Sequence, residues 1–252
     1  MNPSEYTRMF EMEDRYWWFV GRRRIALRLL DRFLNPNPLQ SKIQNPKSKI
    51  LLDVGCGTGV VLKDLESRGS PVGLDMSPLA LGFCQRRGLN RLIRGDATAM
   101  PLAANCVGAI VALDVFEHIE YDTAAFVEAY RTLAPGGILV LSVPAFQSLW
   151  GPHDVALMHY RRYTRRELRE RLVSAGFTIE RLSYSVFFLF PIVVIVRFFE
   201  KRKKGPAKAS LVALPNWINA FLIGVQTIEA AMIAKFSLPW GSSLLGVARK
   251  PK

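Results

Sequence analysis

Residues 50–59 read Ile-Leu-Leu-Asp-Val-Gly-Cys-Gly-Thr-Gly, an apolar run that leads directly into three glycines spaced two residues apart. The run has the length and composition of a buried β-strand. The glycines predict a tight turn at the start of a helix, where the backbone can approach a ligand closely. Asp75 ends the next apolar run, where a carboxylate is placed to accept hydrogen bonds from the two hydroxyls of a ribose. This stretch therefore predicts a nucleoside site at the carboxyl edge of a sheet.

Four more apolar runs, at 71–75, 92–96, 108–115 and 137–144, are separated by segments long enough for crossover helices. This alternation is typical of an α/β fold with a doubly wound, mostly parallel sheet. The 252 residues suffice for one such domain with an elaboration, and the 50% hydrophobic content excludes disorder as the main state.

The glycine spacing is G-x-G-x-G and residue 60 is valine, so the G-x-G-x-x-G fingerprint of dinucleotide sites is not met. Asp53, two residues before the first glycine, would repel a pyrophosphate. The same carboxylate suits a ligand that carries ammonium and sulfonium charges. The turn therefore favours a cationic nucleoside, although a plain strand-to-helix turn would use the same glycines.

The segment Asp53–Gly59, together with Asp75, resembles the class I S-adenosylmethionine (SAM)-dependent methyltransferases, of the methyltransferase type 11 or ubiquinone-biosynthesis-like kind. Gly95–Ala97, Leu113–His118 and Leu133–Gly137 resemble later motifs of that family, in the same order. The resemblance implies a Rossmann-like sheet of seven strands with an antiparallel last strand, and SAM as cofactor. The cofactor-binding residues it implies are Asp53, Gly55, Gly57, Gly59, Asp75, Met76, Asp96, Ala97 and Leu113; Met76 is equally consistent with simple packing.

The loop after residue 144 gathers histidine, tyrosine and arginine at the edge where doubly wound folds bind ligands. A neutral imidazole can accept a proton from a hydroxyl or an acidic carbon, so His153, His159 and His118 are candidate catalytic bases, with His153 first. Packing or hydrogen bonding is the alternative role of each. His153, Asp154 and His159 lack the further donor that a metal needs, so no metal is expected. The candidate substrate-binding residues are Trp18, Trp150, Arg162 and Tyr163.

The chain divides into five parts. Residues 1–34 are a predicted helical lid in which Tyr16, Trp17 and Trp18 fold over the site, with helix packing as the alternative role of these aromatics. Residues 35–48 are a linker rich in Asn, Pro and Ser. Residues 49–185 are the SAM-binding core, with a sixth strand at 177–184. Residues 186–240 are an apolar helical insertion, and 241–252 are the final strand and tail.

Charge is unevenly distributed, at +5 for residues 1–50, −3 for 51–150 and +11 for 151–252. The basic clusters adjoin aliphatic runs rather than stacking aromatics, so no nucleic acid partner is expected. We expect the insertion to be a helical hairpin that lies over the substrate pocket and dips into a membrane surface. A lid on the domain and a dimer interface are alternatives; polar Asn216, Asn219, Gln226 and Glu229 make a bilayer span the second choice. The residues expected to face anionic headgroups are Arg197, Lys201, Arg202, Lys203, Lys204 and Lys208.

The first thirty residues contain no secretory signal and the three cysteines lack C-x-x-C spacing, so we expect a cytoplasmic protein, peripheral at the inner face of the membrane. The predicted function is SAM-dependent methyl transfer to an oxygen or carbon of a small hydrophobic or lipid-like acceptor. Two alternatives stay open: an NAD-dependent or nucleotide-sugar oxidoreductase, and a non-catalytic scaffold docked on a membrane. The acceptor and the oligomeric state are left undetermined.

Overall fold

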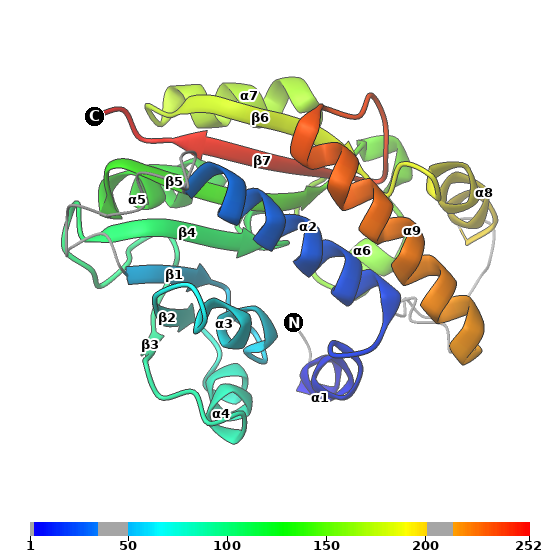
Figure 1. Ribbon diagram of the computed structural model, residues 1–252, viewed down its shortest axis with the longest axis horizontal. Coiled ribbons are helices and arrows are strands. Elements are labelled where there is room, and N and C mark those ends of the chain that lie inside the picture. The colour runs from blue at the N-terminus through cyan, green and yellow to red at the C-terminus, as the bar shows by residue number, and fades with distance from the viewer. Residues whose placement is uncertain (1–2, 35–49, 201–213) are drawn as a thin grey trace.

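A computed structural model describes residues 3–34, 50–200 and 214–252 (Figure 1). It contains a seven-stranded sheet in the order β3-β2-β1-β4-β5-β7-β6. The first five strands are parallel, and β7 runs antiparallel to both β5 and β6. This confirms the predicted fold. The strands are β1 (Ile50–Val54), β2 (Ser70–Asp75), β3 (Leu92–Arg94), β4 (Val107–Leu113), β5 (Leu133–Pro144), β6 (Thr178–Ser185) and β7 (Ser243–Arg249).

One predicted boundary differs, because the apolar run predicts the fifth strand at 137–144, with the Leu133–Gly137 motif as the turn before it. Strand β5 instead begins at Leu133, which pairs with Val107 of β4. The register shifts between Val107 and Ala109, so the pairing continues through an irregularity. Residues 134–137 thus stand opposite the single residue Gly108, so the expected turn is present as a bulge within β5.

The order of strands reverses between β1 and β4, which are neighbours although β2 and β3 lie between them in sequence. Leu51 pairs with Ala109 and Asp53 with Val111, so the carboxyl ends of both strands meet at the same edge. Doubly wound folds bind ligands at such a switch point, because the crossovers leave opposite faces and open a crevice.

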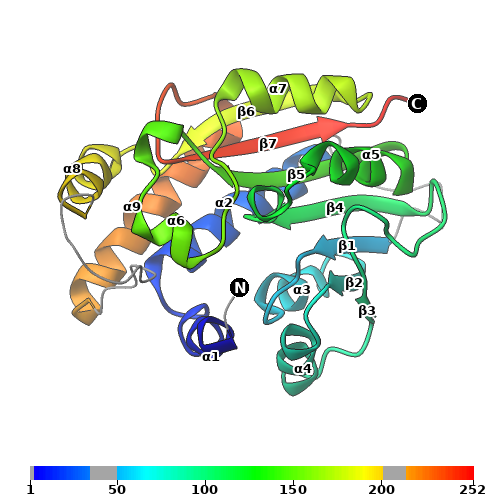
Figure 2. The same cartoon turned by 180° about the vertical axis from the view of Figure 1, so that it is seen from behind.

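Helices cover both faces of the sheet (Figures 1 and 2). Helices α5 (Asp122–Thr132) and α7 (Arg165–Ser174) bury Phe126, Leu168 and Leu172 on one face. Thr164 caps α7 in a capping box with Glu167, as its sequence predicts. The other face carries α2 (Trp17–Leu34), α3 (Val60–Leu65) and α9 (Asn216–Lys235). Helix α4 (Pro78–Arg86) packs beside α3, and α1 (Pro3–Met12), α6 (Pro152–Ala156) and α8 (Phe190–Glu200) surround the carboxyl edge.

Helices α2 and α9 lie side by side although they come from opposite ends of the chain (Figure 1). Gly21 makes this approach possible, since a Cβ atom there would lie 2.7 Å from Cγ of Gln226. Asn219 accepts a hydrogen bond from the Trp17 backbone at 2.8 Å, and Glu229 accepts one from the Phe187 backbone at 2.9 Å. The polar residues of α9 thus attach it to the domain.

The insertion has an unusually exposed apolar part. Helix α8 buries none of its residues, and α9 buries one face only. By length and composition, α9 is the one helix in the described part of the chain that could cross a membrane. The predicted linker 35–48 and the basic residues Lys201 to Lys208 lie outside the described residues.

Candidate functional site

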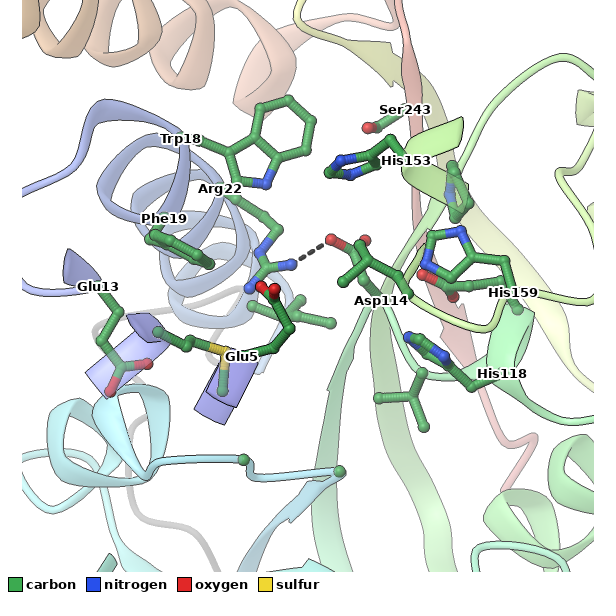
Figure 3. Close-up of a pocket in the computed structure, with 18 of the residues that line it drawn as sticks. Glu5, Glu13, Trp18, Phe19, Arg22, Asp114, His118, His153, His159 and Ser243 are labelled. Atoms are coloured by element: carbon green, nitrogen blue, oxygen red, sulfur yellow. Dashed lines mark hydrogen bonds and ion pairs between the residues drawn. The ribbon is translucent and has the colours of Figure 1, made fainter. Parts of the chain in front are cut away.

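A cavity of about 990 Å³ runs along the carboxyl edge of the sheet. Its walls come from α1, α2, the glycine turn after β1, the loops after β4 and β5, α8 and α9. Figure 3 shows His118, His153 and His159 on one side of this cavity and Trp18, Phe19 and Arg22 from α2 on the other. The cavity has two ends: one at the glycine turn, lined by buried carboxyl groups, and one at Asp114 and the three histidines.

The first end is the glycine turn. Gly55 and Gly57 have positive φ angles of 65° and 54°, a backbone conformation that favours glycine. A Cβ atom at Gly55 would also lie 2.6 Å from Val115. Asp75 accepts hydrogen bonds from the backbone N–H groups of Gly57 at 2.9 Å and Ser77 at 2.8 Å. The carboxylate that was predicted to bind ribose thus also holds the turn in shape.

Three buried carboxyl groups, Asp53, Asp75 and Glu13, line this end. Burial is the main cause that raises the pKa of each, and for Asp53 the neighbouring charges of Asp75 and Glu13 add to the rise. Within the described residues, Oδ2 of Asp53 has no hydrogen-bond partner. A positively charged ligand would stabilise these carboxylates, and SAM carries both an ammonium and a sulfonium group. The residues present therefore fit that cofactor.

Helix α1 covers the same end, which sequence analysis did not anticipate in detail. Glu13 accepts hydrogen bonds from the Thr58 hydroxyl and, at 2.7 Å, from Arg87. The Phe10 ring packs on Phe83 with centroids 4.8 Å apart. Glu5, Tyr6, Met9 and Glu13 all face the cavity. The partners of Glu13 are 45 and 74 residues away, so no local pattern marks it as part of the site.

The second end begins at Asp114, which follows β4 with a φ angle of 56°. Arg22 of α2 forms an ion pair with it, and the Ser142 hydroxyl donates a hydrogen bond at 2.7 Å. Burial would raise the pKa of Asp114, but the Arg22 charge and the Ser142 hydrogen bond hold it below its usual value. Asp114 is therefore the paired counterpart of the unpaired Asp53. Sequence analysis placed it in a motif without giving it a role.

The three histidines stand on this wall (Figure 3). Nδ1 of His159 lies 3.0 Å from Oδ1 of Asp154, which also accepts a hydrogen bond from Nε of Arg162 at 2.8 Å. Burial lowers the pKa of His153 to about 3, with the Arg197 charge adding to it, and lowers that of His118 to about 4. At neutral pH both imidazoles are uncharged.

A separate wall of the cavity is apolar and comes from the insertion 186–240. Seven aliphatic side chains line it, from α8 and α9 and from the residues just before each helix. They are Leu189, Ile192, Val193, Val196, Leu214, Ile218 and Leu222. The insertion is predicted to lie over the substrate pocket, and Leu214 and Ile218 belong to its apolar helical seam. Their helical spacing gave the signal, because residues three or four apart share one face of a helix.

Most of the predicted site residues line this one cavity. They are Asp53, Gly55, Gly57, Asp75, Met76, Asp96, Ala97, Leu113, His118, His153, His159, Trp18 and Arg162, with Tyr16 and Trp17 of the predicted lid.

Three predicted residues do not lie on the wall. Gly59 has a φ angle of 88° and packs against Leu89 and Cys84 at the start of α3. Tyr163 is a core residue, 2% exposed, whose hydroxyl donates to Asp122 at 2.7 Å. Trp150 occupies the turn between Leu149 and α6, outside the cavity. These three residues were predicted because they are close in sequence to residues of the site. In the fold they lie outside the cavity lining.

Comparison with known proteins independently relates the part of the chain that contains the glycine turn to methyltransferases. Residues 52–141 match the family model described as a methyltransferase domain. A probable SAM-dependent methyltransferase of Mycolicibacterium smegmatis is 33% identical over 137 residues, 52% of each chain. An uncharacterized methyltransferase of Mycobacterium ulcerans is 29% identical over 51% of this chain and 54% of its own. The chain thus spans about half the length of the curated relatives it matches.

Solved structures share the fold at low sequence identity. A geranyl diphosphate methyltransferase in complex with SAM has a TM-score of 0.56 at 18% identity, over 89% of this chain and 84% of that one. Phosphoethanolamine N-methyltransferase 2 of Haemonchus contortus, also with SAM, has a TM-score of 0.56 at 18% identity, over 90% of this chain and 52% of that one. These similarities support the observed architecture.

Proposed function

We propose, from the premise that this chain carries a class I SAM-dependent methyltransferase domain, that it transfers a methyl group from SAM to an oxygen or carbon of a small hydrophobic or lipid-like acceptor. The reaction would take place in the cytoplasm at an anionic membrane surface. One observation carries the proposal: a single cavity joins an end lined by three buried carboxyl groups, of which Asp53 has an unpartnered oxygen within the described residues, to a wall of aliphatic side chains.

SAM would be held at the acidic end. Asp75 would accept hydrogen bonds from the ribose hydroxyls, Asp53 would face the ammonium group, and Asp96 would meet the adenine amino group. SAM supplies the reactive methyl group and its own leaving group, so the protein mainly has to align the acceptor and exclude water. Helix α1 and the side chains of Tyr16 and Trp17 cover the site and serve this exclusion.

The acceptor would lie between the histidine wall and the insertion. Aliphatic side chains of α8 and α9 favour a hydrocarbon body, and the polar groups at the opposite wall favour a hydroxyl or acidic carbon at its reactive end. His118, His153 and His159 remain the candidate acceptors for its proton.

The outer side of the insertion supports action at a membrane. Ile195, Phe198 and Phe199 of α8 are each more than half exposed, as are Trp217 and Phe221 of α9. The segment between these helices contains Lys201, Arg202, Lys203 and Lys204. Exposed aliphatic and aromatic residues beside a basic cluster are typical of segments that enter the headgroup region of anionic bilayers.

Methyl transfer can be tested with radiolabelled SAM and a membrane-lipid extract, alongside calorimetry of SAM and S-adenosylhomocysteine. We expect micromolar cofactor binding, on the order of −8 kcal/mol, and label in an extractable lipid. A thermal shift with NAD but not with S-adenosylhomocysteine would favour the oxidoreductase instead. Cofactor binding without transfer into any extract would favour the scaffold.

Membrane action can be tested by pelleting the protein with phosphatidylglycerol vesicles at low and high salt. The double variant Ile195→Ser, Phe199→Ser should pellet less than wild type, since it removes exposed apolar area. Val127→Ser is the matched control, because Val127 is 49% exposed on helix α5, far from the insertion. Protein that stays in the supernatant under both salt conditions would contradict membrane docking.

A further inference from the structure

Glu117, His118 and His159 form a compact group on the acceptor wall. Each offers one ligand atom, and these three atoms lie within 4.8 Å of one another. All three residues line the cavity. Glu117 and His118 follow β4 in the short helix η3 (Phe116–His118), whereas His159 comes from the loop after β5. Two histidines and one carboxylate are a ligand set that proteins use for catalytic zinc and for other divalent transition metals.

Glu117 gives an independent reason to expect a cation here. Its side chain is fully buried, and within the described residues neither carboxyl oxygen has a hydrogen-bond partner. A buried carboxyl group without a partner is costly, and it is ordinarily paired or bound to a metal. The orphaned oxygens lie next to the two imidazoles.

The histidines also have the outer partners that metal ligands need. Nδ1 of His159 faces Oδ1 of Asp154, which leaves Nε2 for another ligand. Asp154 is itself fixed by Arg162 and by the backbone N–H of Gly151 at 2.9 Å. The backbone of Met158 lies close to the His118 ring. Metal-binding histidines almost always use their second nitrogen in this way, because the contact fixes the orientation of the ring.

Main-chain contacts hold the two segments in register. The Tyr160 N–H donates to the Glu117 carbonyl at 2.8 Å, directly beside His159. The Tyr163 N–H donates to the Pro144 carbonyl at 2.8 Å, which returns the loop to the end of β5. The rings of His118 and His159 meet edge to face with centroids 4.6 Å apart. The group is therefore built by the fold and does not depend on flexible surface side chains.

We propose that Glu117, His118 and His159 bind one divalent transition metal, with zinc as the first candidate and a fourth coordination position open to the cavity. Ligand atoms around tetrahedral zinc lie about 3.3 Å apart, so a small closure of the three side chains completes the site. Metal binding itself does not require methyl transfer. Its use rests on the proposed function: an acceptor oxygen at the open position would lose its proton more readily, and His153, which is outside the ligand set, would be the group that takes the proton.

The test uses the whole untagged protein, stripped of metal with a chelator and titrated with Zn²⁺ by calorimetry. We expect one equivalent to bind. The variants Glu117→Gln and His159→Ala should bind at least about 10-fold more weakly, and Asp154→Asn, which alters only the outer partner, about 10-fold more weakly. His153→Ala is the matched control, since His153 lines the same cavity outside the ligand set, and it should bind like wild type.

Cobalt provides a measurement that does not depend on the variants folding. Co²⁺ bound to wild type should give the visible absorption of a four- or five-coordinate N/O site, and Zn²⁺ should displace it. Failure of the stripped wild type to take up either ion, or equal uptake by wild type and Glu117→Gln, would overturn the metal site. Calorimetry with SAM on the same stripped sample tests the proposed function separately, because the carboxylates at the cofactor end are not part of the ligand set.

Discussion

The two ends of the cavity were built in different ways. The cofactor end comes mainly from short contiguous stretches, 53–59, 75–77 and 95–97, each at the end of a parallel strand, and α1 with Glu13 is its one distant contribution named above. The acceptor end is assembled from distant segments: Arg22 pairs with Asp114 across 92 residues, and Trp17 with Asn219 across 202. A local motif can therefore encode the first, whereas only the folded chain creates the second.

The ends also differ in charge balance. Asp53 at the cofactor end has an unpartnered oxygen within the described part of the chain, whereas Asp114 at the acceptor end is paired with Arg22. A cationic ligand would therefore be paired by Asp53, whereas Asp114 is already neutralised by Arg22 as part of the folded framework. Variants at the two ends should accordingly separate cofactor affinity from stability.

The largest effect is expected for Asp75→Ala. This variant removes the predicted ribose acceptor and the oxygens that hold the N–H groups of Gly57 and Ser77. We expect SAM affinity to fall about 100-fold, or about 3 kcal/mol, by calorimetry. Glu66→Ala is the control, since Glu66 is exposed and lies outside the cavity. Unchanged affinity in Asp75→Ala would mean that the cofactor end has been misidentified.

Glu229→Gln should alter the pH dependence of stability. Burial raises the pKa of Glu229 from 4.5 to about 7, so the folded protein holds a proton that the unfolded chain releases. The wild type should therefore lose stability as pH rises between these values. Relative to Glu229→Gln, it should lose about 2 kcal/mol between pH of about 5 and about 8.

Urea unfolding of both proteins at the two pH values measures this difference. Glu66→Gln, at an exposed position, should follow the wild-type profile. If the free energy of unfolding of wild type and Glu229→Gln changes equally with pH, Glu229 does not hold an extra proton in the folded state.

Arg22→Met separates the two ends most directly. It leaves Asp114 with only the Ser142 hydroxyl, so the free energy of unfolding should fall by about 1.5 kcal/mol. SAM affinity should stay within about threefold, or about 0.7 kcal/mol. Arg28→Met, an exposed position on the same helix, should change neither quantity. A larger loss of SAM affinity than of stability would show that Arg22 belongs to the cofactor end.

The smallest effect concerns the contact of α2 with α9. Gly21→Ala gains helix propensity but places a methyl group 2.7 Å from Gln226, so we expect a net loss of about 1 kcal/mol. Gly224→Ala has open space within 4 Å and should gain about 0.5 kcal/mol. Thermal unfolding of the pair checks the sign; two gains would show that the helices are not closely packed.

The sequence by itself determined the sheet and the cofactor end. Strand ends, glycine turns and the acids that follow them are set by neighbours a few residues away, so β1, β2 and β4 lie within one or two residues of their predicted bounds. The same local logic misplaced the start of β5, where Leu133 pairs with a distant strand, and assigned Tyr163 to the site although its hydroxyl is held by Asp122 in the core.

Only the tertiary structure decided what faces the acceptor. The pairing of Arg22 with Asp114 and the meeting of Glu117 with His159 each join residues that no short pattern connects. Burial and long-range electrostatics depend on how whole helices and strands pack, and the aliphatic wall exists only because α8 and α9 return to the sheet. Contacts between residues close in sequence therefore determine most of the cofactor end. Packing between distant helices and strands determines the rest of the cavity.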